Sequence, residues 1–109
     1  MEKIKVKLKI NDYIIEKEGI IKNDILIINN NEEIITFDIK KLILTKETKE
    51  LSLSLDFMKK EVTYKIPEID NKFSSKILNL SLTNKDKEYI INYQIEESNF
   101  SLNLKYETI

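Results

Sequence analysis

Apolar and polar residues alternate with a period of two along much of this chain, a pattern typical of strands with one buried face and one wet face. The opening stretch, KIKVKLKI over 3–10, alternates lysine with an aliphatic residue at every step. The same alternation predicts further strands at 50–57, 61–66, 78–83 and 99–106. In each of them, the leucine, isoleucine, valine and aromatic residues are expected to face a core.

Five other stretches are apolar on both faces in part, as in ILII and EYIINYQI, and they are predicted to be strands at 13–21, 24–29, 33–39, 41–45 and 88–95. Such strands are expected where a sheet is covered on two sides or curls over itself. Asn and Asp punctuate the chain in place of Gly, since both tolerate the left-handed backbone of tight turns. Because the turns are about ten residues apart, the chain is predicted to form an up-and-down meander that closes into a sandwich or barrel.

The single glycine and the single proline of the chain mark breaks in this pattern. Pro67 cannot donate to a β-ladder, so it is expected to end a strand. The stretch PEIDNKFSSK over 67–76 is the least regular part of the chain and is predicted to hold a helical turn. Gly19 is interpreted as a bend or bulge where a curled strand has no room for a side chain.

The composition of the 109 residues limits the classes of function. Its 18 basic and 19 acidic residues leave a net charge of −1, so no global field attracts nucleic acid or anionic lipid. The absence of cysteine fits a reducing compartment. Nothing in the sequence reaches the roughly 18 consecutive apolar residues that a membrane span needs. The expectation is a single domain over 1–109 that is located in the cytoplasm and has no membrane segment.

Catalysis by histidine or cysteine is excluded, because the chain contains neither residue. The remaining nucleophile candidate is Ser74-Ser75-Lys76, which is interpreted as a polar loop because adjacent residues rarely converge on one substrate. Neighbouring carboxylates such as Glu96 and Glu97 point to opposite faces of an extended chain, so they cannot flank one bond, whereas pairs from different strands stay open. The chain is therefore not expected to be an enzyme.

Oxygen ligands recur at every second position in TNKDKE, where Asn84, Asp86 and Glu88 could line one side of a calcium site. The glycine and the twelve-residue spacing of a calcium loop are missing, so a hairpin turn is the favoured interpretation. Phosphate cradles need glycine-rich loops, and the chain has one glycine. No metal site and no cofactor are predicted.

Lys3, Lys5, Lys7 and Lys9 form a row on one face of the first predicted strand. Residues on one face recur roughly every 6.6–6.8 Å, so four ammonium groups span about 20 Å, enough to follow several phosphates. Single-strand binders of the barrel type add exposed aromatic residues and prefer arginine, and this face has neither. The favoured interpretation is a solvated wall that discourages edge-to-edge pairing, and a nucleic-acid or anionic surface is the alternative.

The C-terminal part, IINYQIEESNFSLNLKYE, contains I-x-Y-x-I, a short polar turn and a closing N-F-x-L-x-L-x-Y. With the tyrosine-bearing strand before it, this order resembles the end of the YwiB-like family of small, uncharacterised bacterial proteins. The segment EGIIKNDILIINN is similar to that family's glycine-bearing strand and the strand after it. The resemblance implies that the all-β, single-domain antiparallel meander closes into a calycin-like (lipocalin-like) β-barrel of about 8–10 strands. It implies no known activity.

Two functions stay open at this point. The first is a ligand-binding barrel, the default for calycin-like folds, in which inward apolar residues enclose a small hydrophobic molecule. Its expected binding residues are Tyr64, Tyr89, Tyr93, Phe100 and Tyr106. The second is a protein- or RNA-interaction module that acts through its outer surface and has a solid interior. The partner is unknown, and neither nucleic acid nor a membrane is the expected one.

The interior of the barrel is expected to be filled or nearly so, because its candidate residues are large and pack to the density of a protein core. They are Leu51, Leu53, Leu55, Phe57, Tyr64, Leu78, Leu80, Tyr89, Ile91, Tyr93, Phe100, Leu102, Leu104 and Tyr106. A connected void among them would favour the ligand carrier, and solid packing would favour the interaction module.

Overall fold

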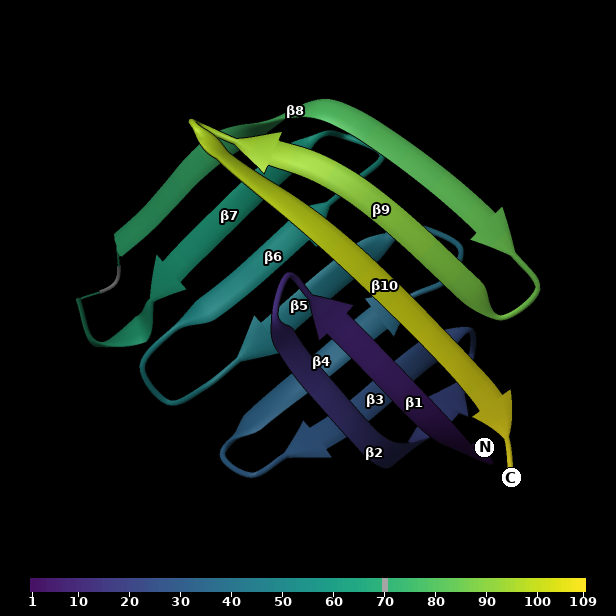
Figure 1. Cartoon of the computed structure of the whole chain (residues 1–109). Helices are drawn as coiled ribbons and strands as arrows, with labels where there is room; N and C mark the ends of the chain where they lie inside the picture. Colours follow the sequence, from purple (N-terminus) through teal and green to yellow (C-terminus); the bar gives the residue numbers. More distant parts are fainter. Residues whose placement is uncertain (70) are drawn as a thin grey trace.

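Ten antiparallel strands form a closed barrel in the computed structural model, which describes residues 1–69 and 71–109 (Figure 1). In chain order they are β1 (Glu2–Ile10), β2 (Tyr13–Lys22), β3 (Ile25–Asn30), β4 (Glu33–Asp38), β5 (Ile43–Glu47), β6 (Ser52–Asp56), β7 (Glu61–Ile66), β8 (Asn71–Lys85), β9 (Glu88–Ile95) and β10 (Ser98–Thr108). Each strand pairs with its neighbours in sequence, and β10 pairs with β1 to close the ring. The predicted all-β meander, closed into a barrel, is confirmed.

The strands lie close to where the alternation predicts them, with one large exception. β8 runs over Asn71–Lys85, so the prediction that 67–76 is irregular is wrong beyond the short 3-10 helix η1 (Pro67–Ile69). Asp70, which belongs to the same stretch, lies outside the described residues. The polar sequence NKFSSK at the start of β8 hides the strand from a hydrophobic pattern, because the ladder to β7 rather than burial holds it in place.

A bulge in β8 changes which of its leucines face the interior. Ile77 is buried and Leu78 is 46% exposed, and the pairing with β9 shifts between Leu78 and Ser81. Asn79 sits in the shifted segment with a φ of 49°, which is a left-handed conformation that Asn tolerates. The prediction that Leu78 faces the interior is therefore wrong. Leu51 is also exposed, because it precedes the first residue of β6.

The turns confirm that Asn and Asp take the place of Gly. Asn11, Asn23, Asp24 and Asn31 have φ angles between 52° and 64°, in the left-handed region that these residues adopt at low cost. Other turns have the same backbone at residues that no turn rule singles out, namely Leu42, Lys60, Lys87 and Glu96.

Gly19 lies where β2 passes close to β3. A Cβ atom on Gly19 would lie 2.5 Å from the carbonyl oxygen of Ile27, a backbone atom that cannot rotate away. The position therefore has no room for a side chain, as predicted. Gly19 pairs regularly with Ile4 of β1, so the cause is a close approach of two strands and not a bulge.

The chain termini lie together at one end of the barrel (Figure 1), where the Ile109 amide donates a hydrogen bond of 3.1 Å to the Lys3 carbonyl. We call this the closed end, because the buried rings of Phe37 and Phe57 lie in its interior. Phe57, from the turn after β6, is 1% exposed and packs edge-on against Tyr93, with 5.3 Å between ring centroids. Phe37 packs in the same way against Tyr89 at 5.1 Å. The opposite end, which carries the β1–β2, β3–β4, β5–β6 and β9–β10 turns, we call the open end.

Candidate functional site

An apolar cavity of about 220 Å³ occupies the interior at the open end. It is lined by residues from eight strands: Leu8, Ile10, Tyr13, Ile35, Leu44, Lys46, Leu53, Leu55, Tyr64, Tyr93, Ile95 and Phe100. The space exceeds by several-fold the roughly 30 Å³ that one water molecule occupies in the liquid. The expectation that the interior is filled or nearly so is wrong at the open end.

Stacked aromatic rings form one wall of this cavity. Tyr93 and Phe100 lie on the adjacent strands β9 and β10, with 5.2 Å between ring centroids and an interplanar angle of 14°. Burial, with a smaller contribution from Tyr64, raises the pKa of Tyr93 to about 12. The hydroxyl of Tyr93 therefore stays protonated at neutral pH and is a polar group in an otherwise apolar wall.

The structure brings together three of the five residues predicted to bind a ligand. Tyr64, Tyr93 and Phe100 line the cavity at the open end. Tyr89 is buried against Phe37, and Tyr106 is half-buried opposite Val6 of β1, so neither reaches the cavity. All five predicted binding residues lie on inward positions of their strands. Because β9 and β10 are long, their inward positions extend from the open end to the closed end of the barrel.

A polar network that the sequence pattern did not reveal borders the cavity. The Tyr13 hydroxyl donates to Oε1 of Glu33 over 2.9 Å, and the side-chain amide of Asn30 donates to the same oxygen over 2.8 Å. Nζ of Lys46 lies 3.1 Å from Oε2 of Glu33 and 5.6 Å from the centre of the Tyr13 ring. The four residues come from β2, β3, β4 and β5 and are called the rim network below.

Glu33 is the centre of the rim network and remains charged. Its side chain is 14% exposed, and burial alone would raise its pKa. Hydrogen bonds from Asn30, Lys46 and Tyr13 outweigh burial, so the pKa of Glu33 lies below its usual value. The pKa of Tyr13 is raised in turn, first by its hydrogen bond to Glu33 and then by burial, so the phenol remains a donor.

The rim network presents only part of itself to the cavity. Lys46 and Tyr13 line it, whereas Glu33 and Asn30 line a separate depression at the same end of the barrel. The ladder explains this arrangement, because Lys46 is opposite Ile35 and two positions after the buried Leu44 on β5. The strand predicted over 41–45 ends one residue before Lys46, whereas β5 continues to Glu47, so the prediction did not place this lysine at an inward position.

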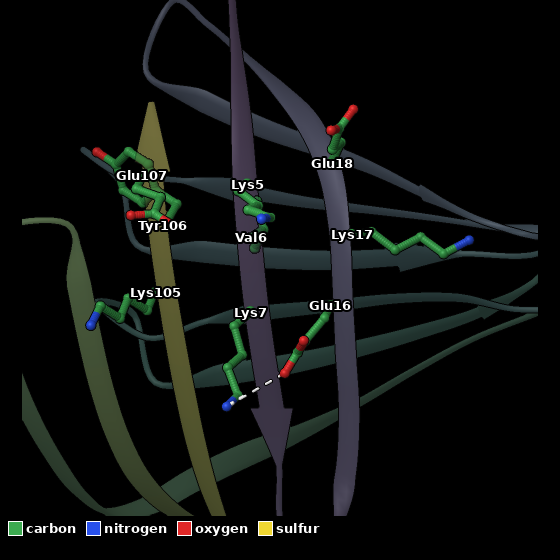
Figure 2. A pocket seen from close by; sticks show the side chains of 9 residues that line it. All are labelled: Lys5, Val6, Lys7, Glu16, Lys17, Glu18, Lys105, Tyr106 and Glu107. Atoms are coloured by element: carbon green, nitrogen blue, oxygen red, sulfur yellow. Dashed lines mark ion pairs between the residues drawn. The ribbon is translucent and has the colours of Figure 1, made fainter. Parts of the chain in front are cut away.

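The predicted lysine row lies on the outer face of β1, where Lys3, Lys5, Lys7 and Lys9 are all exposed. Figure 2 shows the shallow depression over β10, β1 and β2 that contains two of them. Carboxylates of both flanking strands lie beside the lysines there, and Lys105 of β10 is opposite Lys7. Lys7 lies 3.5 Å from Glu16, and Lys5 is opposite Glu18 on β2 and Glu107 on β10.

The remaining candidates for chemistry stay apart. Ser74, Ser75 and Lys76 are consecutive residues of β8, so their side chains alternate between its two faces. Asp86 lies in the turn between β8 and β9, as the hairpin interpretation of TNKDKE predicts. Within residues 1–69 and 71–109, no group of three or more acidic residues is placed to hold a metal ion. The same residues contain no helix that is long and apolar enough to cross a bilayer.

No protein-family model, no curated protein and no solved structure matches the chain. The resemblance to the YwiB-like family therefore stays a prediction, and the candidate site rests on its geometry.

Proposed function

We propose that this barrel is a non-enzymatic, calycin-like binding protein that holds a small hydrophobic molecule in the cavity at its open end. The observation that carries the proposal is the cavity of about 220 Å³ with its apolar lining. Small-molecule sites are concave and mostly apolar, with a few polar groups that fix orientation. Here those groups are the hydroxyls of Tyr64 and Tyr93, together with Tyr13 and Lys46 of the rim network.

The size of the cavity sets the size of the ligand. An apolar cavity of about 150 Å³ holds a benzene molecule, so by proportion a cavity of about 220 Å³ suits a ligand of roughly nine non-hydrogen atoms. Octan-1-ol has this size and carries no charge. At the ligand efficiencies usual for molecules this small, its Kd is expected to be about 1 mM or lower.

A titration followed by methyl NMR tests the proposal. Octan-1-ol is expected to shift the methyl signals of Leu53, Leu55 and Ile95 in a saturable way, and Leu53→Trp, which fills the cavity, should abolish the shifts. Leu51→Trp is the matched control, because Leu51 is exposed and does not line the cavity. The proposal is wrong if the wild type shows no saturable shift, or if both tryptophan variants bind as the wild type does.

The alternative, an interaction module acting through the outer wall, draws less support from the lysine row. Glu16, Glu18 and Glu107 flank the row and lower its positive potential, as expected for a solvated face. RNA binding with a steep salt dependence, lost on replacing all four lysines by Gln, would favour the alternative. We further propose a cytoplasmic location, on the basis of the cysteine-free sequence.

A further inference from the structure

We propose that the cavity selects a small carboxylate with an apolar tail, and that Lys46 binds its head group. This inference rests on the proposed function, because it concerns the same cavity. Two charged residues of the rim network differ in their position: Lys46 lines the cavity, whereas Glu33 does not.

The hydrogen bonds of Glu33 explain why its carboxylate is not the group that a ligand in the cavity binds. Oε1 of Glu33 accepts from Tyr13 and Asn30, and Oε2 faces Lys46 at 3.1 Å. Both oxygens therefore have protein partners. Of the roughly four acceptor sites of a carboxylate, only one on Oε2 is left, and a cationic ligand that reaches it would lie beside the ammonium group of Lys46.

Lys46 is the residue of the rim network that has hydrogen-bond donors left for a ligand. An ammonium carries three donors, and the ion pair with Glu33 occupies one direction. The side chain is 41% exposed, its strand position faces the interior and the residue lines the cavity, so its ammonium is within reach of a head group at the mouth of the cavity. A carboxylate placed there forms a charge-assisted hydrogen bond while its tail lies against Leu53, Tyr93 and Phe100.

Other charges at the open end act more weakly on a ligand in the cavity. Asp12, Glu50 and Glu96 lie in or beside turns at this end and are exposed, and none of them lines the cavity. At physiological ionic strength, charges in water are screened over about 8 Å. A salt concentration of 0.15 M therefore separates the contact with Lys46 from the negative field of the turns.

Three probes with the same tail and different heads test the inference: octanoate, octan-1-ol and octylammonium, titrated into the folded protein at pH 7 and 0.15 M salt. Because a hydrogen bond to a charged group contributes about 1.5 kcal/mol or more, octanoate is expected to bind about tenfold more tightly than octan-1-ol. Octylammonium is expected to bind most weakly. Equal Kd values for octanoate and octan-1-ol, or tightest binding of octylammonium, overturn the inference and leave the proposed function standing. Failure of all three to bind overturns both.

A substitution then assigns the preference to Lys46. Lys46→Met should remove the preference, so that the Kd values of octanoate and octan-1-ol agree within about twofold. The double variant Lys46→Met, Glu33→Gln does the same without leaving Glu33 unpaired, and it serves if the single variant folds poorly. Lys9→Met, on the outer face of β1, is the matched control and should retain the preference. Retention of the preference in the folded Lys46→Met or double variant overturns the assignment.

Discussion

The Tyr13 hydroxyl and the Glu33 carboxylate, 2.9 Å apart, join β2 to β4 at the open end of the barrel. The backbone pairs between β2 and the intervening strand β3 lie elsewhere, at Ile20–Lys22 with Ile25–Ile27. Side chains of the rim network therefore hold the wall together at this level, and they do so directly beside the cavity.

Removal of that hydroxyl should weaken the wall locally. Tyr13→Phe deletes the donor to Glu33 and the acceptor for Asn30, and the free energy of unfolding is expected to fall by about 0.5–1 kcal/mol. Amide hydrogen exchange in β2 should accelerate between Tyr13 and Glu18 more than between Ile20 and Lys22. Uniform acceleration along β2 would contradict a local role, and Tyr106→Phe on β10 is the control.

Acid should uncouple the rim network. The folded-state pKa of Glu33 is lowered from the usual 4.5, so its contribution to stability is complete above pH 4.5 and is lost as the pH falls through the folded-state value. Denaturant unfolding of the wild type between pH 7 and pH 3 should therefore show a steeper acid loss than that of Glu33→Gln. Parallel pH profiles of the two proteins would show that Glu33 carries no such linkage.

Gly19 should not tolerate a methyl group. Because a Cβ atom would sit 2.5 Å from the Ile27 carbonyl oxygen, Gly19→Ala forces β2 and β3 apart, with an expected loss of about 1–3 kcal/mol. The neighbouring Glu18 is exposed, so Glu18→Ala should change the free energy of unfolding by less than about 0.5 kcal/mol. Chemical denaturation measures both, and a Gly19→Ala protein as stable as the wild type would refute the close approach.

The bulge in β8 can be checked with two adjacent residues. Ile77 is 2% exposed and Leu78 is 46% exposed, so Ile77→Ala is expected to cost about 2–5 kcal/mol and Leu78→Ala about 0.5 kcal/mol or less. The simple alternation of Leu78, Leu80 and Leu82 predicts the reverse order. Equilibrium unfolding in urea decides between the two.

The fold was readable from the sequence because half of the predicted strands alternate with a period of two and several turns carry Asn or Asp. The alternation of Ile4, Val6 and Leu8 leads directly to three buried side chains. The failures have local causes. Asn79 inserts a bulge into β8, and the first residues of β8 are too polar to show an apolar face.

The candidate site was harder to foresee because it depends on the register of neighbouring strands and on which strands the closed barrel brings around one space. Tyr93 and Phe100 are separated by one hairpin, and their pairing follows from the meander. Lys46 and Glu33 meet only through the register of β4 and β5.

A crystal structure determined under xenon pressure tests most directly whether the barrel holds an accessible apolar cavity. Xenon enters dry cavities lined by aliphatic and aromatic side chains. The account predicts a xenon peak between Leu55, Tyr93 and Phe100, absent from crystals of Leu53→Trp. A xenon-free barrel in which side chains fill this space would contradict it.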